Sequence, residues 1–214
     1  ASNVIATSIV SRGRQRGRLY AFDKKEVVFG SNVHRKHIQI VADLTGVAIE
    51  NDVIFQIIRN HEKVDRQISI GAEIQSQLLP DQCPIIEGVE LAACCRPAFQ
   101  VGGDYYDFFP QDDGSMYVVC GDATGHGLNA GMMVSITKAG LYGSDFDTPA
   151  STTTRLNKTI KAIDLGTTRM SLNMAKFNNG SFDFTSAGMP PAYLYKHHSK
   201  EVDEILIPGL PLGS

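Results

Sequence analysis

Two segments, VGGDYYDFF (101–109) and VVCGDATGHG (118–127), decide the fold of this 214-residue chain. Each places an aspartate directly after glycine, beside a short run of aromatic or β-branched residues that predicts a strand. If the two strands are neighbours, Asp104 and Asp122 project into a shared cleft. Carboxylate oxygens are the hard ligands that Mg²⁺ and Mn²⁺ prefer, and the glycines let backbone approach an ion or a phosphate closely. The pattern therefore predicts a divalent metal site and, as a hypothesis, phosphoryl chemistry.

Other polar residues of these segments allow plainer interpretations, because Gly-Asp pairs are also ordinary turn chemistry. We expect Asp107 to support the loop rather than to bind metal, and Thr124 to serve as a turn or helix-cap group. His126 is expected to order its loop by hydrogen bonding, with a role as general acid as the alternative. Only its charge suggests that Arg96 reaches a substrate phosphate.

Composition excludes several classes of protein. The chain carries 20 Lys and Arg against 23 Asp and Glu, with 43% hydrophobic residues, which indicates a packed protein rather than a disordered one. The balance gives no reason to expect a nucleic-acid partner. No apolar run reaches the roughly 18 residues that span a bilayer, so we expect no membrane partner. Four cysteines without CxxC spacing predict reduced, mostly buried thiols in a cytoplasmic protein.

The N-terminal part has its own pattern. Residues 3–11 and 17–23 are rich in Val, Ile and aromatics, and the polar turn between them predicts a hairpin. From about Ile38 to Leu79 apolar residues recur at spacings of three and four, which predicts a long helix. Two interpretations stay open: a linker that pairs with its copy in a homodimer, or two or three helices with a kink at Gly71.

After Pro80 the pattern changes to short β-rich runs, at residues 88–96, 115–121, 170–177, 181–186 and 192–196. Helical stretches are expected at about 128–143 and 150–164. Strands, then helices, then strands again predict an α+β fold in which an antiparallel sheet packs with helices.

Five blocks carry a resemblance to a known family: IQSQLLP (74–80), GGDYYDFF (102–109), GDATGHG (121–127), FTSAGMPPAYLY (184–195) and GLPLGS (209–214). In order and spacing they resemble the metal-dependent PPM (protein phosphatase 2C-type) phosphatases, in the bacterial branch of RsbU and SpoIIE. The resemblance implies a serine/threonine phosphatase with a β-sandwich flanked by helices.

The resemblance also implies a catalytic site. Asp104 matches the first acidic position, Asp122 the ligand that bridges two Mn²⁺ or Mg²⁺ ions, and Ala123 the position whose carbonyl completes one ion site. A metal-activated water would hydrolyse phosphoserine or phosphothreonine. By the same resemblance, the substrate is a phosphorylated anti-sigma-factor antagonist of a partner-switching pathway.

The expected domain organisation follows. RGRQRGRLYAFDKK (12–25) and IVADLTGVAIEND (40–52) resemble the end of a GAF sensor domain, so residues 1–52 are assigned to such a domain. Residues 53–80 are expected to form the linker helix, for which a coiled coil is one interpretation. Residues 81–214 are expected to form the phosphatase domain. Family members continue to later Asp motifs, so we expect a truncated domain and keep a non-catalytic regulatory or dimerisation module as the alternative. The GGD and DATGHG segments are also similar to loops of nucleotide-handling enzymes. This similarity does not extend to the neighbouring blocks of the sequence, so a nucleotide-handling enzyme is the less favoured alternative.

Overall fold

The computed structural model describes residues 3–23, 32–86, 88–97, 100–178 and 180–214. The chain divides into two compact units, Ala1–Asp65 and Arg66–Ser214. Each unit has its own β-structure, and the helix α1 (Asn32–Ser76) contributes residues to both.

The first unit pairs a β-hairpin with the part of α1 that ends at Asp65. Strands β1 (Asn3–Ser11) and β2 (Arg14–Asp23) are antiparallel, with a register shift between Ile9 and Val10. This confirms the expected hairpin, although β2 begins three residues earlier than the sequence predicts. Thr7 donates a hydrogen bond to Gln39 of α1, and an ion pair of 2.6 Å joins Arg12 to Glu50. The last two residues of the GAF-like segment 12–25 lie outside the described residues.

Helix α1 runs without interruption for 45 residues, so the alternative of several helices kinked at Gly71 is wrong. Both of its glycines are places of close approach. At Gly46 a side chain would collide with the backbone of Val10, and at Gly71 a Cβ would lie 3.0 Å from the side chain of Leu128. The small cost of glycine in a helix is therefore offset by packing that a larger residue prevents.

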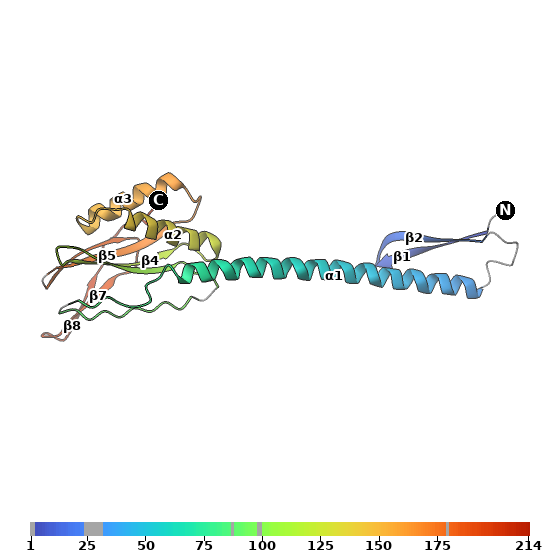
Figure 1. The fold of residues 1–214 in the computed structure, drawn as a ribbon, viewed down its shortest axis with the longest axis horizontal. Helices are drawn as coiled ribbons and strands as arrows, with labels where there is room; N and C mark the ends of the chain where they lie inside the picture. The colour runs from blue at the N-terminus through green and yellow to red at the C-terminus, as the bar shows by residue number, and fades with distance from the viewer. Residues whose placement is uncertain (1–2, 24–31, 87, 98–99, 179) are drawn as a thin grey trace. The chain divides into compact units, whose positions relative to one another are not determined.

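The second unit is built on an antiparallel sheet of order β3-β4-β5-β6. Its strands are β3 (Asp104–Pro110), β4 (Met116–Ala123), β5 (Met170–Asn178) and β6 (Ser181–Ala187). Helices α2 (Leu128–Tyr142) and α3 (Pro149–Ile163) cover one face, and the segment before β3 lies on the other side (Figure 1).

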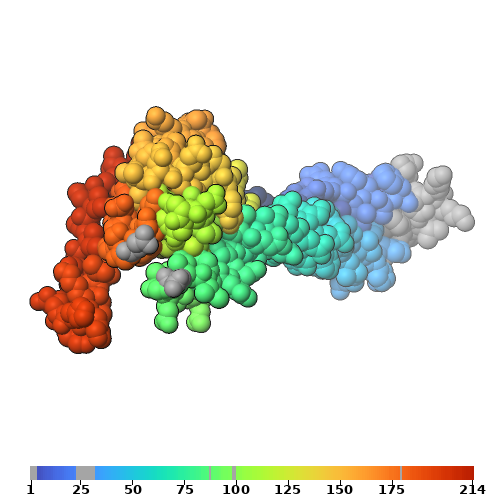
Figure 2. Space-filling view, turned by 60° about the vertical axis from the view of Figure 1, so that its left-hand side comes forward, coloured from blue at the N-terminus to red at the C-terminus, as the bar shows by residue number. Residues whose placement is uncertain are grey.

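The core lies between that sheet and the two helices, because alternate strand residues point toward them. The largest buried side chains of this layer are Tyr105, Tyr117, Met133, Leu141, Leu156, Met170, Leu172 and Met174. A second hairpin, β7 (Ala192–Lys196) with β8 (Glu201–Ile205), forms a separate two-stranded sheet that projects from the unit in Figure 2. The α+β class with an antiparallel sheet and flanking helices is confirmed.

Three expectations need correction. Residues 90–97 form no strand, and the predicted strand 88–96 is represented only by an isolated bridge between Ile86 and Val89. Strand β8 was not anticipated. The cysteines are free, but they are not mostly buried, since Cys94 and Cys120 are exposed and the other two half-buried. Every helix of the described residues is too short or too polar to cross a lipid bilayer.

Candidate metal centre

Asp104 and Asp122 face each other across the first two strands of the sheet. Asp104 begins β3, Asp122 lies one residue before the end of β4, and the register makes them direct partners. Both are exposed, and they lie on the face of the sheet opposite to the strand residues that are buried under the helices. Partial burial and then the negative charge of Asp104 raise the pKa of Asp122 above its ordinary value. Two like charges held together in this way favour a divalent cation between them.

Gly103 is a place of close approach beside these carboxylates. A Cβ at this position would lie 2.5 Å from the carbonyl oxygen of Ala123 and 2.9 Å from Oδ1 of Asp122. The Ala123 N–H donates to the carbonyl of Gly103 at 2.9 Å and fixes this approach. The structure thus brings together the two aspartates and the Ala123 carbonyl that the sequence singled out, and adds Gly103 to them.

The donor set fits part of a hard-cation site. It consists of oxygens alone, two from aspartates that are strand partners and one from the backbone, as Mg²⁺ and Mn²⁺ require. Within the described residues no group of three or more His, Cys, Asp or Glu is arranged to hold a metal ion. An ion bound by these groups alone would keep several waters, which is the usual behaviour of Mg²⁺.

Asp107 lies on the opposite side of the sheet from Asp104. Residues three apart in a strand point to opposite faces, and the Asp107 side chain is buried under α2. Its carboxylate accepts hydrogen bonds from Lys138 Nζ at 2.7 Å, from the Tyr105 hydroxyl at 2.9 Å and from the Phe108 N–H at 2.9 Å. The structure therefore separates Asp107 from the metal centre, as expected of a supporting residue.

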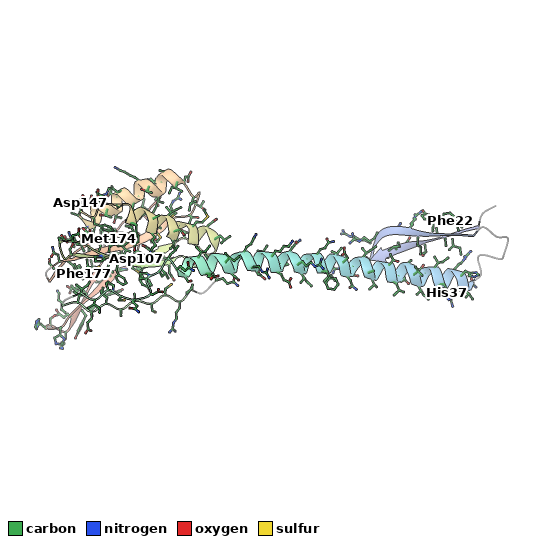
Figure 3. The ribbon with its side chains drawn as sticks, in the orientation of Figure 1. Phe22, His37, Asp107, Asp147, Met174 and Phe177 are labelled. Carbon is green, nitrogen blue, oxygen red and sulfur yellow. The ribbon has the colours of Figure 1, made fainter. Side chains whose placement is uncertain are left out.

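Lys138 connects this buried carboxylate to the segment that follows α1. Its ammonium also donates to the carbonyl of Leu78 at 2.7 Å, and Figure 3 shows Asp107 near this end of α1. On the other face of β3, the Tyr106 hydroxyl donates to the Pro80 carbonyl at 3.1 Å. The IQSQLLP block is thus attached to β3 at two points.

A third attachment reaches the metal centre itself. The Gln75 amide nitrogen donates to the Gly102 carbonyl at 2.7 Å, and the Gly102 N–H donates back to the Gln75 Oε1 at 2.9 Å. Gly102 precedes Gly103 and Asp104, so the last turn of α1 fixes the backbone beside Asp104, the first candidate ligand. Gln75 and Lys138 were missed at the sequence level, although the IQSQLLP block was a signal for Gln75.

The turn after β4 is fixed by hydrogen bonds to residues of other segments. Thr124 Oγ1 donates to the Arg169 carbonyl at 3.1 Å and accepts from the Arg169 N–H at 3.0 Å. Gly127, with a φ of 83°, begins α2 and donates its N–H to the Val101 carbonyl at 3.0 Å. Thr124 is therefore a turn group, as expected. His126 lies exposed in this turn, and Arg96 lines the same cavity as Asp104.

Part of this chain is similar to a known protein family. Residues 112–214 match the family described as stage II sporulation protein E (SpoIIE). The phosphoserine phosphatase RsbU of Bacillus subtilis (strain 168) is 28% identical over 159 residues, which are 71% of this chain and 46% of that protein. Protein IcfG of Synechocystis sp. is 30% identical over 73 residues, 34% of this chain and 12% of that one. The chain thus spans less than half the length of the curated relatives it matches.

Similarity also extends to a solved structure. The SiaA-PP2C domain of Pseudomonas aeruginosa superposes with a TM-score of 0.57 at 18% sequence identity, covering 72% of this chain and 64% of that one. At this identity the likeness establishes the fold, which agrees with the antiparallel sheet and flanking helices described above.

Proposed function

We propose that the chain is part of a metal-dependent protein serine/threonine phosphatase of the RsbU/SpoIIE branch, in a bacterial partner-switching pathway; the match of residues 112–214 to the SpoIIE family and the similarity to RsbU support this proposal. The observation that carries the proposal is the pairing of Asp104 with Asp122 beside the Ala123 carbonyl and the closely packed Gly103. These groups would hold Mn²⁺ or Mg²⁺, with two ions in the complete site. Bound ions would activate water and neutralise charge on the phosphoryl oxygens.

The chain's own residues position the site. Gly103 lets the backbone before β3 approach Ala123 and Asp122 closely, because the Cβ of any other residue would collide with the Ala123 carbonyl oxygen and with Asp122 Oδ1. Gln75 fixes the preceding peptide from α1 through two hydrogen bonds. The Asp107–Lys138 pair holds the opposite face of β3. The phosphate ester would then approach from the open face of the sheet, where Asp104 and Asp122 are exposed.

Substitution of the bridging ligand tests the activity. Asp122→Ala in the full-length protein should abolish Mn²⁺-dependent hydrolysis of a phosphoserine peptide, because the cation loses the carboxylate nearest to Ala123. Asp112→Asn, at an exposed turn between β3 and β4, is the matched control and should hydrolyse the peptide at the wild-type rate. Retained hydrolysis by Asp122→Ala would refute the assignment.

The proposed substrate is a phosphorylated anti-sigma-factor antagonist, in line with the similarity to RsbU. We also propose a cytoplasmic location and a GAF-like sensor role for the first unit. The linker helix would transmit the state of the sensor, because its last turn is hydrogen-bonded to the backbone next to Asp104.

Helix α1 is proposed to pair with α1 of a second copy. Apolar residues at coiled-coil spacing are exposed along it, including Ile40, Leu44, Val47 and Ile58. The spacing of four, three and eleven residues keeps them on one seam, and Asn51 falls at a seam position, where a polar residue fixes the register of paired helices. A self-complementary seam of this kind suits an identical helix.

The second candidate is a non-catalytic regulatory or dimerisation module. It is favoured by the small ligand set, since the described residues offer no arranged group of three or more metal-binding side chains. Calorimetric titration of this chain with Mn²⁺ separates the candidates. Tight binding of two ions would argue against the non-catalytic module, and no detectable binding would favour it.

A further inference from the structure

One cavity of the second unit brings together most of the chain's thiols. It measures about 520 Å³ and lies between the irregular segment Leu91–Arg96 and strands β3 and β4. Cys94 and Cys95 line it from the segment, and Cys120 lines it from β4. Three of the four cysteines therefore share one cavity, while Cys83 lines a different one.

The thiols in this cavity lie near one another. Asp104, Cys94 and Cys120 are all close enough to Cys95 for their charges to act on its thiol. Cys120 points to the same face of β4 as Asp122, because the two residues are two apart in the strand. Cys95 therefore has a partner on each side, one next to it in sequence and one on β4.

The choice between these partners follows from covalent geometry. A bond between the neighbours Cys94 and Cys95 would strain the peptide that joins them, because a disulfide needs a dihedral angle near 90° and separated Cα atoms. Cys95 and Cys120 belong to different segments that meet at the cavity, and residues 90–97 form no ladder that would resist a small adjustment.

We propose that Cys95 and Cys120 form a disulfide when the protein meets a peroxide. Peroxide oxidises one thiol to a sulfenic acid and releases one water. The second thiol then attacks that sulfur, releases a second water and closes the S–S bond, so that two electrons pass from the thiols to the peroxide. The bond would fix the segment 91–96 across the sheet face that carries Asp104 and Asp122.

The experiment incubates the whole chain with excess hydrogen peroxide for hours, alkylates the remaining thiols and measures the intact mass. The expected product has two alkylated thiols in place of four, and peptide mapping finds Cys95 linked to Cys120.

Variants make the assignment specific. Cys120→Ser should leave three alkylated thiols and no internal disulfide, and Cys95→Ser, which lies in the irregular segment, gives the same readout if Cys120→Ser does not fold. Cys83→Ser is the control and should still form the bond. A bond that includes Cys94 or Cys83, a bond between two chains on a non-reducing gel, or no bond at all would overturn the proposal.

Discussion

Substitution of Lys138 tests whether Asp107 has a structural role, as the partner of Lys138, rather than a role in metal binding. In Lys138→Met, the buried Asp107 side chain loses its ion-pair partner at 2.7 Å. The carbonyl of Leu78 loses a donor in the same substitution. The methionine keeps most of the length of the lysine side chain, so packing under α2 changes little.

The expected loss of stability follows from the burial of the pair. Breaking a buried ion pair by removing one partner costs about 3–5 kcal/mol. Here the Tyr105 hydroxyl and the Phe108 N–H still donate to Asp107, and the Lys138 side chain is 21% exposed. We therefore expect about 2–3 kcal/mol, which for a unit of this size lowers Tm by roughly 5–10 °C.

Urea unfolding followed by tyrosine fluorescence measures this effect in the second unit. The chain has no tryptophan, and all of its tyrosines except Tyr20 lie in that unit. The double variant Asp107→Leu/Lys138→Met removes both charges and should recover a large part of the lost stability, because no unpaired charge remains buried.

Two results would refute a structural role for the Asp107–Lys138 pair. The first is a Lys138→Met variant as stable as the wild type, which would mean that the pair contributes nothing in solution. The second is an Asp107→Asn variant that loses Mn²⁺ affinity as strongly as Asp122→Asn does. That outcome would place Asp107 among the metal ligands, on the wrong side of the sheet for the structure described here.

The remaining predictions concern the metal centre and the helix. Gly103→Ala should lower Mn²⁺ affinity by about tenfold or more by calorimetry, because its Cβ would collide with the Ala123 carbonyl oxygen and with Asp122 Oδ1 and displace both groups; Gly143→Ala, whose Cβ meets only an ordinary contact at 3.4 Å, should not change the affinity. Gln75→Ala removes two hydrogen bonds of about 0.5–1.5 kcal/mol each, so amide exchange at the GGD segment should accelerate by roughly 10-fold or more without global unfolding. Leu44→Glu should convert the dimer into a monomer in sedimentation velocity, and an unchanged sedimentation coefficient would count against pairing through α1. In chelator at pH 7, Asp122→Asn should be more stable than the wild type, because the raised pKa means that the folded state holds the charged Asp122 less favourably than the unfolded state does. This difference in stability should shrink as the pH falls through the raised pKa of Asp122. A stability difference that grows toward acid pH would contradict the prediction.

Local pattern predicted most elements of the second unit. The bounds of α2, α3 and β5–β7 agree with the expected runs to within a few residues, because each has a clear period and nearby turn signals. The run 88–96 has strand propensity but no ladder partner in the described residues, and propensity alone does not form a strand. Strand β8 was missed because three of its five residues are acidic. Continuity of α1 at Gly71 depends on packing against Leu128, which no local pattern contains.

The pairing of the two candidate metal ligands was predictable, because it depends on strand register. Once two Gly-Asp segments lie on neighbouring strands, Asp104 and Asp122 are brought together by register alone. The spacing of three between Asp104 and Asp107 already implied opposite faces, but the partner of Asp107 was not predictable, since Lys138 is 31 residues further along the chain. The same holds for Gln75, whose contact with Gly102 requires the end of α1 to lie against the metal loop.

The most direct test of a metal centre at Asp104 and Asp122 is an electron paramagnetic resonance titration of Mn²⁺ into this chain and its single variants. The wild type and Asp112→Asn should bind Mn²⁺ alike, and Asp104→Asn and Asp122→Asn should each weaken binding by about tenfold or more. Equal binding by all four proteins would contradict a metal centre at the paired aspartates.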